Sequence, residues 1–419
     1  MTSGILRRIS RTIAAQTKYD QLGVPFLRYL LVFGLFTVAG SLSGSYFGVF
    51  LLRATGSSMA LMKYNLLLAC VQPFVMLTAV SVLRHGSVNL CLRVGLMLHA
   101  LSYVVLTLID GSATSMVYLV SVISSSGNAF FYTAYTPQIL GYTKDDNRDT
   151  AYGAIGLFTT VVSLVLPLMT GFFISAFGDL TGYKVLFILS SLILLGGLGA
   201  SYRLMPLPNQ TGVRKSQLRA TAKRFFRNKA LMQSMGVTML DSIRTSGSGY
   251  FITLLIFELL QKEAVMGMLT AVTAVLSMAV NVAYGRFVTA GNRGRGMLFG
   301  SVGALLAVCI VCLYRTATGY VVYSLLGCLV GVFMGNPVIT GYMSVVQHDP
   351  VLAQNGGEVH ALREFFYASG RVLGLLPVFF LPDPAQAAPL MMVLLSALQI
   401  PASLMTIALQ KKQQAALAQ

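Results

Sequence analysis

Five charged residues interrupt two of the apolar runs in this sequence, and their side chains could carry proton or ion chemistry. Asp241 and Arg244 lie in one run, and Arg363, Glu364 and Arg371 lie in another. A charge placed inside a bilayer costs roughly 2.5–3.5 kcal/mol on insertion scales and is usually paired or functional. A partly desolvated carboxylate next to an arginine can exchange a proton when the local field changes. Asp241 and Glu364 are therefore the candidate proton-coupling acids.

The first pair belongs to a polar face of its expected helix. Arg244, Thr245 and Ser248 follow Asp241 at spacings that place them on one helical face. Asp241 lies about 16 Å from the start of the run at 1.5 Å per residue, which is deep in a bilayer. We expect this face to line a central cavity, with Arg244 contributing to ligand binding. The alternative is an intrahelical Asp241–Arg244 pair that only neutralises itself.

The second run carries one stripe of polar side chains, since His360, Glu364, Tyr367 and Arg371 recur at spacings of four, three and four residues. Arg371 lies about 18 Å into the run, near the middle of the bilayer, and its guanidinium suits carboxylate or phosphate. Glu364 is about 10 Å away along the helix axis, too far for a guaranteed direct pair. We expect Arg371 and Tyr367 to bind an acidic group of a ligand. The alternative is a stripe that only ties this helix to a neighbour.

The charge balance of these two runs also bears on the ligand. Two acids and three arginines leave a net charge of +1, and protonation of one acid raises it to +2. Such a field favours an anionic or zwitterionic ligand, because arginine binds carboxylate and phosphate well. Further polar candidates for ligand binding lie in other apolar runs: Asn128, Tyr132, Asn336, Tyr46 and Tyr250. Their alternative role is hydrogen bonding between helices, and His99 is expected to be a satisfied core histidine.

The composition explains why these charges matter. Of the 419 residues, 55% are hydrophobic and only 10% are charged, whereas soluble domains carry roughly 25% charged residues. The apolar runs are continuous over about twenty residues, which fits spanning helices, and they do not alternate as barrel strands do. We therefore expect an all-α polytopic protein of the cell membrane.

The net charge of +17 does not indicate nucleic-acid binding, because the basic residues lie mainly in the connections between apolar runs. In that position they favour anionic lipid headgroups as partners and orient the chain in the membrane. Their excess on one side predicts that both termini are cytoplasmic. Five cysteines without a disulfide pattern and four histidines without a zinc pattern predict no metal and no other cofactor.

Twelve apolar runs divide into two sets of six on either side of a basic stretch. The expected spans lie near 27–52, 58–83, 89–109, 113–140, 150–177, 182–205, 230–260, 263–288, 296–314, 318–346, 359–381 and 386–410. They predict a basic amphipathic N-terminal segment over 1–26, a six-helix bundle over 27–205, a cytoplasmic linker over 206–229, a second six-helix bundle over 230–410 and a cytoplasmic tail over 411–419.

The two sets of spans are related by sequence, which indicates an internal duplication. Three short matches recur in order at offsets of 204 to 210 residues: Ser43-Gly44-Ser45-Tyr46-Phe47 with Gly247-Ser248-Gly249-Tyr250-Phe251, Gly127-Asn128 with Gly335-Asn336, and Pro167 with Pro377. A parallel repeat of six spans predicts a substrate site between the halves, near the middle of the membrane.

At this level the sequence resembles the major facilitator superfamily over essentially the whole chain. The stretch 285–295 is similar to the family's loop signature without its aspartate, and the resemblance implies gating roles for Arg286 and Arg293. Gly153, Pro167 and Gly171 fall in register with half of the glycine pattern that antiporters of the family carry. The resemblance implies a monomeric secondary transporter of twelve helices, with a small molecule and protons as partners and these three residues in gating.

The resemblance and the acids together predict a bacterial-type transporter for proton-coupled efflux of a small amphipathic, anionic or zwitterionic molecule. Proton-coupled uptake of a small organic anion is the alternative. An enzyme is not expected, because the sequence contains no H-E-x-x-H, G-x-S-x-G or G-x-x-x-x-G-K motif. A channel would have fewer spans, and a non-transporting membrane sensor would carry a soluble output domain.

Overall fold

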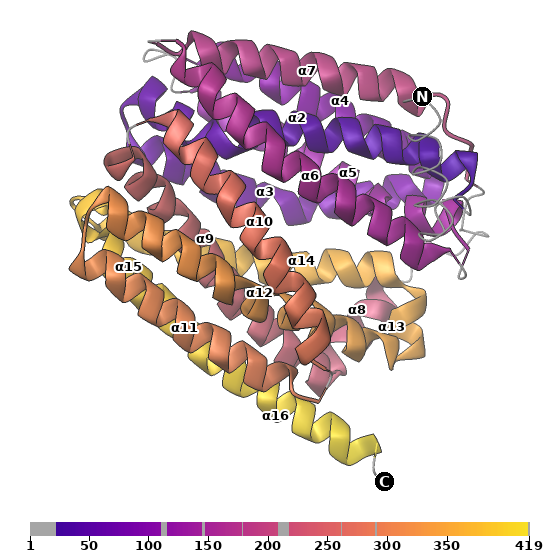
Figure 1. The fold of residues 1–419 in the computed structure, drawn as a ribbon. Helices are drawn as coiled ribbons and strands as arrows, with labels where there is room; N and C mark the ends of the chain where they lie inside the picture. Colours follow the sequence, from indigo (N-terminus) through magenta and orange to yellow (C-terminus); the bar gives the residue numbers. More distant parts are fainter. Residues whose placement is uncertain are drawn as a thin grey trace, which may run out of the picture.

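The computed structural model describes residues 22–109, 115–144, 147–177, 179–207, 218–260, 262–289 and 291–417, and within these ranges it contains helices and loops but no strand. Most of the expected N-terminal segment and residues 208–217 of the expected linker lie outside these ranges. Figure 1 shows two bundles side by side, one built from the first half of the chain and one from the second.

The first bundle contains six long helices, each of which corresponds to an expected span. They are α2 (Val24–Thr55), α3 (Ser58–His85), α4 (Val88–Leu106), α5 (Met116–Tyr142), α6 (Arg148–Ser175) and α7 (Thr181–Ser201). Gly56 ends α2 in the left-handed region, with a φ of 61°, and its amide donates to the Leu52 carbonyl. This conformation is open to glycine without steric cost and lets α3 begin two residues later.

The second half begins with a short surface helix and continues with its own bundle. Its elements are α8 (Leu218–Arg227), α9 (Lys229–Leu259), α10 (Glu263–Phe287), α11 (Arg293–Leu313), α12 (Ala317–Gln347), α13 (Pro350–Gln354), α14 (Gly356–Leu375), the 3₁₀ helix η2 (Leu376–Phe380), α15 (Pro384–Ala397) and α16 (Gln399–Leu417). The expected span 359–381 is thus α14 continued by η2, because Pro377 lacks the amide that would extend the α-helix. The expected span 386–410 is divided into α15 and α16 at Leu398.

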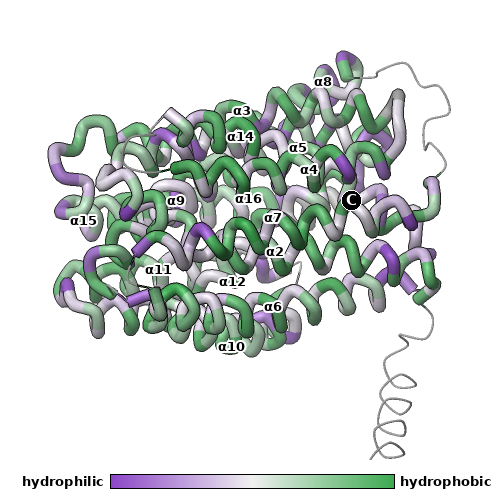
Figure 2. The backbone as a smooth tube through the Cα atoms, turned by 90° about the horizontal axis from the view of Figure 1, so that it is seen from above, coloured by the Kyte–Doolittle hydropathy of each residue, from purple (hydrophilic) through white to green (hydrophobic). Residues whose placement is uncertain are grey.

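Nine segments in the described part of the chain are long and apolar enough to cross a membrane. The three further long helices, α5, α9 and α14, fall outside this set. Length does not exclude α9, since 31 residues extend over about 46 Å, more than the roughly 30 Å of a hydrocarbon core. Figure 2 shows that hydrophobic residues dominate the helices and that hydrophilic ones gather mainly at the two ends of the molecule. Each of the three less apolar helices carries candidate site residues, among them Asn128 on α5, Asp241 on α9 and Glu364 on α14.

The two halves meet along two pairs of helices. One pair is α6 with α10, and the other is α3 with α14. In the first pair the backbones touch, because a Cβ atom at Gly171 would lie 2.5 Å from the Glu263 carbonyl oxygen, and one at Gly267 would lie 2.5 Å from the Pro167 carbonyl oxygen. Only glycine fits at these two positions, so α6 and α10 form the closest approach between the halves that the described residues show.

Two tyrosines make reciprocal contacts across the same boundary. The Tyr46 hydroxyl on α2 donates to the carbonyl of Pro167 at 2.6 Å and lies 3.4 Å from that of Glu263, the first residue of α10. The Tyr250 hydroxyl on α9 donates to the carbonyl of Ser58, the first residue of α3, at 3.1 Å. Each half therefore holds the first turn of the equivalent helix in the other half. These contacts lie at the end where α2 and α9 finish, termed the distal end; the end with α8 and α13 is the proximal end.

Candidate functional site

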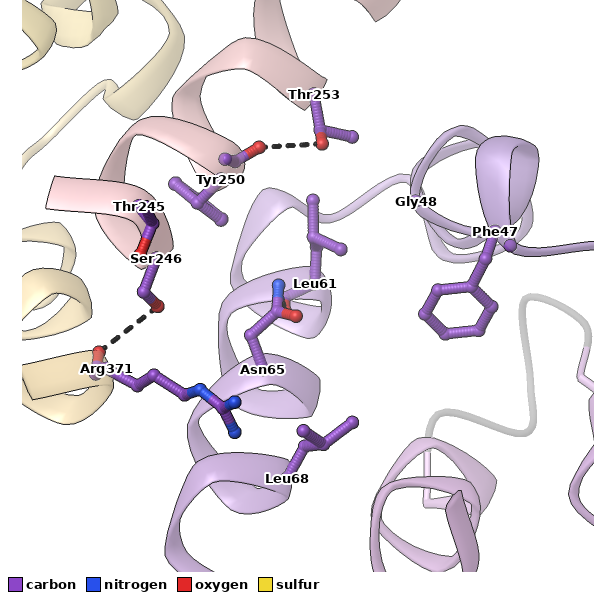
Figure 3. Close-up of a pocket in the computed structure, with 12 residues that line it drawn as sticks. Phe47, Gly48, Leu61, Asn65, Leu68, Thr245, Ser246, Tyr250, Thr253 and Arg371 are labelled. Atoms are coloured by element: carbon purple, nitrogen blue, oxygen red, sulfur yellow. Dashed lines mark hydrogen bonds between the residues drawn. The ribbon is translucent and has the colours of Figure 1, made fainter. Parts of the chain in front are cut away.

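A cavity of about 390 Å³ lies between the halves, bordered by α2, α3, α9 and Arg371 of α14. Figure 3 shows Asn65 and Leu68 of α3, Ser246 and Thr245 of α9, and the Arg371 side chain around this space. The Ser246 hydroxyl donates to the Arg371 carbonyl at 3.3 Å, which fixes α9 against α14 beside the opening. This space is termed the central cavity.

Arg371 is held by three groups at the edge of the central cavity. Its Nη1 donates to the Gln72 Oε1 of α3 at 2.8 Å, its guanidinium carbon lies 4.4 Å from the centre of the Tyr367 ring, and Nη1 is 3.4 Å from the Glu364 Oε1. The direct pair with Glu364 forms because helical side chains lean towards the N-terminus and arginine is long enough to span the turns between them. About a quarter of the side chain remains exposed, so the guanidinium still faces the cavity.

Glu364 is a buried carboxylate with weak pairing. Its Oε1 lies 3.4 Å from Arg371 and accepts no hydrogen bond from the residues that the structure describes. The neighbouring Arg363 points elsewhere, with its guanidinium carbon 4.6 Å from the centre of the Tyr342 ring on α12. Arg371 is therefore the basic group that governs the ionised form of Glu364.

Asp241 and Arg244 do not line the central cavity as expected. They face α16, where Asp241 accepts from Arg244 at 3.0 Å and from the Gln399 side chain at 3.2 Å, while Arg244 Nε donates to Gln399 Oε1 at 3.1 Å. Both side chains are largely buried, and the three groups satisfy one another in a closed network. Thr245 and Ser246 border the cavity instead, since they follow Arg244 by about 100° and 200° around the helix.

The aromatic candidates divide between packing and the cavity. Tyr46 is buried and its hydroxyl is engaged by the carbonyls of Pro167 and Glu263, and its role in ligand binding stays a prediction. Tyr250 borders the central cavity. Tyr367 lies beneath the Arg371 guanidinium and orients it, and its carbonyl accepts the Ser242 hydroxyl at 2.6 Å.

A second cavity, of about 330 Å³, lies within the first half. Its lining is rich in rings and uncharged polar groups: Phe36, Phe47, Tyr64, Tyr103, Asn128 and Tyr132 are among its members. Asn128 and Tyr132 thus both border a space that could hold a ligand. This space is termed the aromatic cavity.

His99 is not the satisfied core histidine that the sequence suggested. It borders the aromatic cavity, and its Nε2 is buried without a hydrogen-bond partner among the described residues. The ring is held by the Asn128 side chain and by an edge contact with Phe36, at a centroid distance of 5.2 Å. A buried polar atom without a partner is costly, which marks this position as a place for a ligand or water.

A third cavity, of about 440 Å³, lies between the halves at the proximal end. Its lining includes Tyr132 and Thr136 of α5, Tyr342 of α12, and Glu358 and His360 of α14. Tyr132 also borders the aromatic cavity, and Gly44 and Phe47 border both the aromatic and the central cavity. The three spaces therefore lie next to one another, from the middle of the molecule to its proximal end.

Asn336 makes a contact between helices and borders none of these three cavities. Its Nδ2 donates to the Asn281 Oδ1 of α10 at 3.3 Å. This contact matches the alternative role that the sequence left open for Asn336, and a role in ligand binding stays a prediction.

The expected gating residues have different surroundings. Arg286 and Arg293 form no ion pair with another described residue, and Asn292 instead orders their loop by accepting the Thr289 amide at 2.7 Å. Pro167 and Gly171 lie at the closest contact between α6 and α10. Gly153 has open space around its Cβ position and takes no part in that contact.

Sequence reasoning missed an acid at the distal end. Glu263 is buried, its Oε1 lies 2.5 Å from Arg53 Nη2 of α2, and it accepts the Tyr183 hydroxyl of α7 at 2.6 Å. Both partners belong to the other half, so this ion pair closes the distal end. The sequence did contain a signal for this residue, because Glu263 is a carboxylate in the first turn of a helix, where the helix dipole favours a negative charge. It was missed because charged residues are ordinary at the junction between a loop and a spanning helix.

Comparison with known proteins agrees with this geometry. Residues 29–375 match the family described as the Major Facilitator Superfamily. A relative from Bacillus subtilis (strain 168), the uncharacterized protein YqgE, is 24% identical over 366 residues, which cover 84% of this chain and 81% of the relative.

Solved structures show the same fold. A bacterial homologue of the iron transporter ferroportin in an inward-facing state aligns with a TM-score of 0.69 at 15% identity, covering 92% of this chain and 98% of that one. The nucleoside transporter NupG aligns with a TM-score of 0.67 at 13% identity, covering 92% and 99%. With two six-helix bundles, a cavity between them and a family match over most of its length, the chain belongs to the Major Facilitator Superfamily and is a multi-pass membrane transporter, not an enzyme.

Proposed function

We propose that this protein moves a small organic anion or zwitterion together with a proton by alternating access. The observation that carries the proposal is the position of Arg371, which faces the central cavity between the halves and is paired with a weakly held carboxylate. Arginine stays charged in proteins, so its positive field persists in each state of the transporter. Arg371 binds the acidic group of the substrate, and Tyr367 and Gln72 hold the guanidinium in place.

The Arg371–Glu364 pair sets the relation between substrate and proton. An anion that occupies the guanidinium removes the partner that stabilises ionised Glu364, so substrate binding and protonation of Glu364 support each other. Two ligands that favour each other's binding travel in the same direction. The geometry thus favours proton-coupled uptake, the alternative in the sequence analysis, over efflux.

Glu364 is a better coupling acid than Asp241. Asp241 is satisfied by Arg244 and Gln399 in a closed network, and a change of its charge would leave Arg244 unpaired. Within the described part of the chain, the ion pair of Glu364 is its weak contact with Arg371, for which the substrate itself competes. We therefore assign proton coupling to Glu364 and a structural role to Asp241.

Proton-coupled export is the second candidate. Pro167 and Gly171, which match half of the antiporter pattern, lie at the contact between α6 and α10 that alternating access would use. Export by exchange requires that substrate and proton exclude each other, so the sign of the proton movement separates the two candidates.

The test uses the purified protein in proteoliposomes that contain a pH-sensitive dye. Acetate, lactate, benzoate and glycerol 3-phosphate are added outside in turn, and internal pH is followed after a correction for passive diffusion in empty liposomes. Acidification that depends on the protein and is lost in Glu364→Gln supports cotransport. Alkalinisation supports export by exchange. The proposal of an anion site fails if Arg371→Gln leaves every response unchanged.

The orientation in the cell is part of the same proposal. The basic loops predict that the proximal end is cytoplasmic, so the third cavity would open inwards and the Arg53–Glu263 pair would close the outside. Thiol labelling of a cysteine introduced at Thr211 tests this side. Labelling by an impermeant reagent from outside intact cells would reverse the orientation.

A further inference from the structure

The aromatic cavity has the form of a binding site, although the anion-binding group of the proposed function lies outside it. Its volume of about 330 Å³ falls at the lower end of pockets for small ligands, roughly 300–1,000 Å³. Five aromatic rings, two of them in Phe36 and Phe47, border it. Phe36 stacks on Phe131 at a centroid distance of 3.6 Å and meets Tyr132 edge-on at 6.2 Å, so the rings hold one another in fixed orientations.

The electrostatic character of this cavity restricts its occupant. Within the described residues its lining contains no Asp, Glu, Lys or Arg, and its polar groups are those of His99, Asn128, serines and tyrosines. A charged group would lose its hydration there without gaining a countercharge. A planar apolar group gains favourable contacts with fixed ring faces and edges, in addition to the burial of its apolar area. The lining therefore fits an uncharged aromatic ring.

His99 adds one directional contact. Asn128 engages the ring, and the buried Nε2 lacks a partner among the described residues. A ring heteroatom or hydroxyl of the occupant would satisfy this atom, and that would recover the cost of leaving it unpaired. Such a contact selects among aromatic ligands by the position of one polar atom.

The aromatic cavity communicates with the cavity that Arg371 borders. Gly44 of α2 borders both spaces, and a Cβ atom built there meets nothing within 4 Å. Gly40, one turn earlier on the same face, borders the aromatic cavity and is equally open. The absence of side chains on this face of α2 leaves a passage, so one molecule could occupy both spaces.

We propose that the substrate is an aromatic carboxylate, whose ring occupies the aromatic cavity while its carboxylate binds Arg371. This inference rests on the proposed function and extends it by naming the substrate class. The first half supplies ring recognition and the hydrogen bond of His99, and the second half supplies the charge. Gly44 is the position that allows the two parts of the molecule to be bound at once.

Binding to the purified protein, measured by calorimetry, tests this assignment with matched probes. The probes are 2-naphthoate, the saturated decahydronaphthalene-2-carboxylate and acetate. We expect 2-naphthoate to bind at least about tenfold more tightly than the saturated acid, whose puckered rings fit poorly between fixed aromatic faces. Equal affinity for the two bicyclic acids would overturn the proposal.

The variants separate the ring site from the anion site. Gly44→Leu fills the passage and should weaken 2-naphthoate at least about tenfold more than it weakens acetate. Gly196→Leu is the matched control, because Gly196 on α7 has equally open space and borders none of the three cavities. His99→Phe should leave 2-naphthoate bound but abolish a preference for 6-hydroxy-2-naphthoate over 2-naphthoate.

The outcomes distinguish this inference from the function on which it rests. If Arg371→Gln weakens all three acids and Gly44→Leu leaves 2-naphthoate unchanged, the aromatic assignment is wrong and the anion site stands. If Arg371→Gln changes none of them, the anion site fails as well. If Gly44→Leu does not fold, Gly44→Cys is used instead. The proposal predicts that bound 2-naphthoate protects this cysteine from a thiol reagent, and absence of protection counts against the proposal.

Discussion

The two halves of this protein share a helix order but differ in chemistry. In the first half, the space between α2, α3, α4 and α5 is lined by rings and uncharged polar groups. In the second half, charged residues occupy the interior positions of α9 and α14. The repeated features are those of packing: the Tyr46 hydroxyl lies 3.4 Å from the Glu263 carbonyl and the Tyr250 hydroxyl lies 3.1 Å from the Ser58 carbonyl, each in the opposite half. In the site that we propose, the first half would recognise the ring of the substrate and the second half would recognise its charge.

The largest effect is expected from substitution of Arg371, which tests whether the charge that binds the substrate comes from the second half. Arg371→Gln deletes the charge of the second half and leaves the aromatic cavity intact. Truncating one partner of a buried charge pair costs roughly 2–5 kcal/mol, so we expect anion affinity and transport to fall by about a hundredfold. Arg371→Lys keeps the charge but loses the planar fork, and it should weaken anions more than neutral analogues. Equal losses for charged and neutral ligands in both variants would place Arg371 outside the binding site.

The next largest effect concerns Asp241, and here we expect a loss of stability. Asp241→Ala removes the acceptor of Arg244 and leaves that charge in a buried position. Breaking such a pair costs roughly 3–5 kcal/mol, so the thermal midpoint in detergent should fall strongly, whereas Asp241→Asn should lower it less. Proton coupling should survive in Asp241→Asn and disappear in Glu364→Gln. The reverse pattern would make Asp241 the coupling acid.

Substitution of Tyr46 and Tyr250 tests whether the two halves make equivalent contacts with each other. Each of Tyr46→Phe and Tyr250→Phe removes a hydroxyl that donates across the boundary, worth about 1 kcal/mol or a factor of about five in the balance of states. In a variant without the five native cysteines, Asn65→Cys should react faster with an impermeant thiol reagent added at the distal side. Similar acceleration by the two changes supports equivalence, and no change in either variant argues against a distal seal.

The smallest effect is a pH dependence at the proximal end. Asp349 accepts Arg224 Nε of α8 at 2.7 Å and caps α13. Burial raises the pKa of Asp349, but the Arg224 side chain and the amides of Leu352 and Val351 outweigh it and hold the pKa below its usual value. Because the folded pKa is lowered, this stabilisation is present above the unfolded pKa of about 3.9 and is lost as pH falls through the folded value.

The hydrogen-exchange rate of the α8 amides measures how strongly the Arg224–Asp349 contact holds α8 in place. Acidification towards pH 3 should raise exchange in α8 of the wild type, after correction for the intrinsic rate. Asp349→Asn should show the raised exchange already at pH 7 and no further rise. A wild-type profile in α8 that is independent of pH would remove Asp349 from this role.

Nine of the spans in the described part of the chain were predictable because they are long apolar runs, and the relation between the two sets of six spans stays a prediction. The direction in which a side chain points was not predictable. Asp241 and Thr245 were placed on one face, yet the first contacts α16 and the second borders the central cavity. The difference is one of helix rotation, which is set by packing partners distant in sequence, such as Gln399.

The cavities could not be predicted from the sequence either, because their walls come from helices that are distant in sequence. His99 appeared to be an isolated polar residue in an apolar run, and only the approach of α5 and α2 gives it Asn128 and Phe36 as neighbours. Glu263 appeared to be a loop charge, and only the second half's contact with α2 and α7 makes it a partner of Arg53. At both positions the sequence gives the type of residue, but the neighbours of its side chain are known only from the structure.

The glycine contact between α6 and α10 has a mechanical consequence. Gly171 and Gly267 place backbone against backbone, with the Tyr46 hydroxyl packed at both glycines. In the proposed alternating-access cycle, the halves would pivot about this contact. Since it lies near the distal end, a small rotation about it would move the proximal ends of the helices through a much longer arc. A small change in the angle between the two halves at the distal end would therefore produce a large change in the width of the opening at the proximal end.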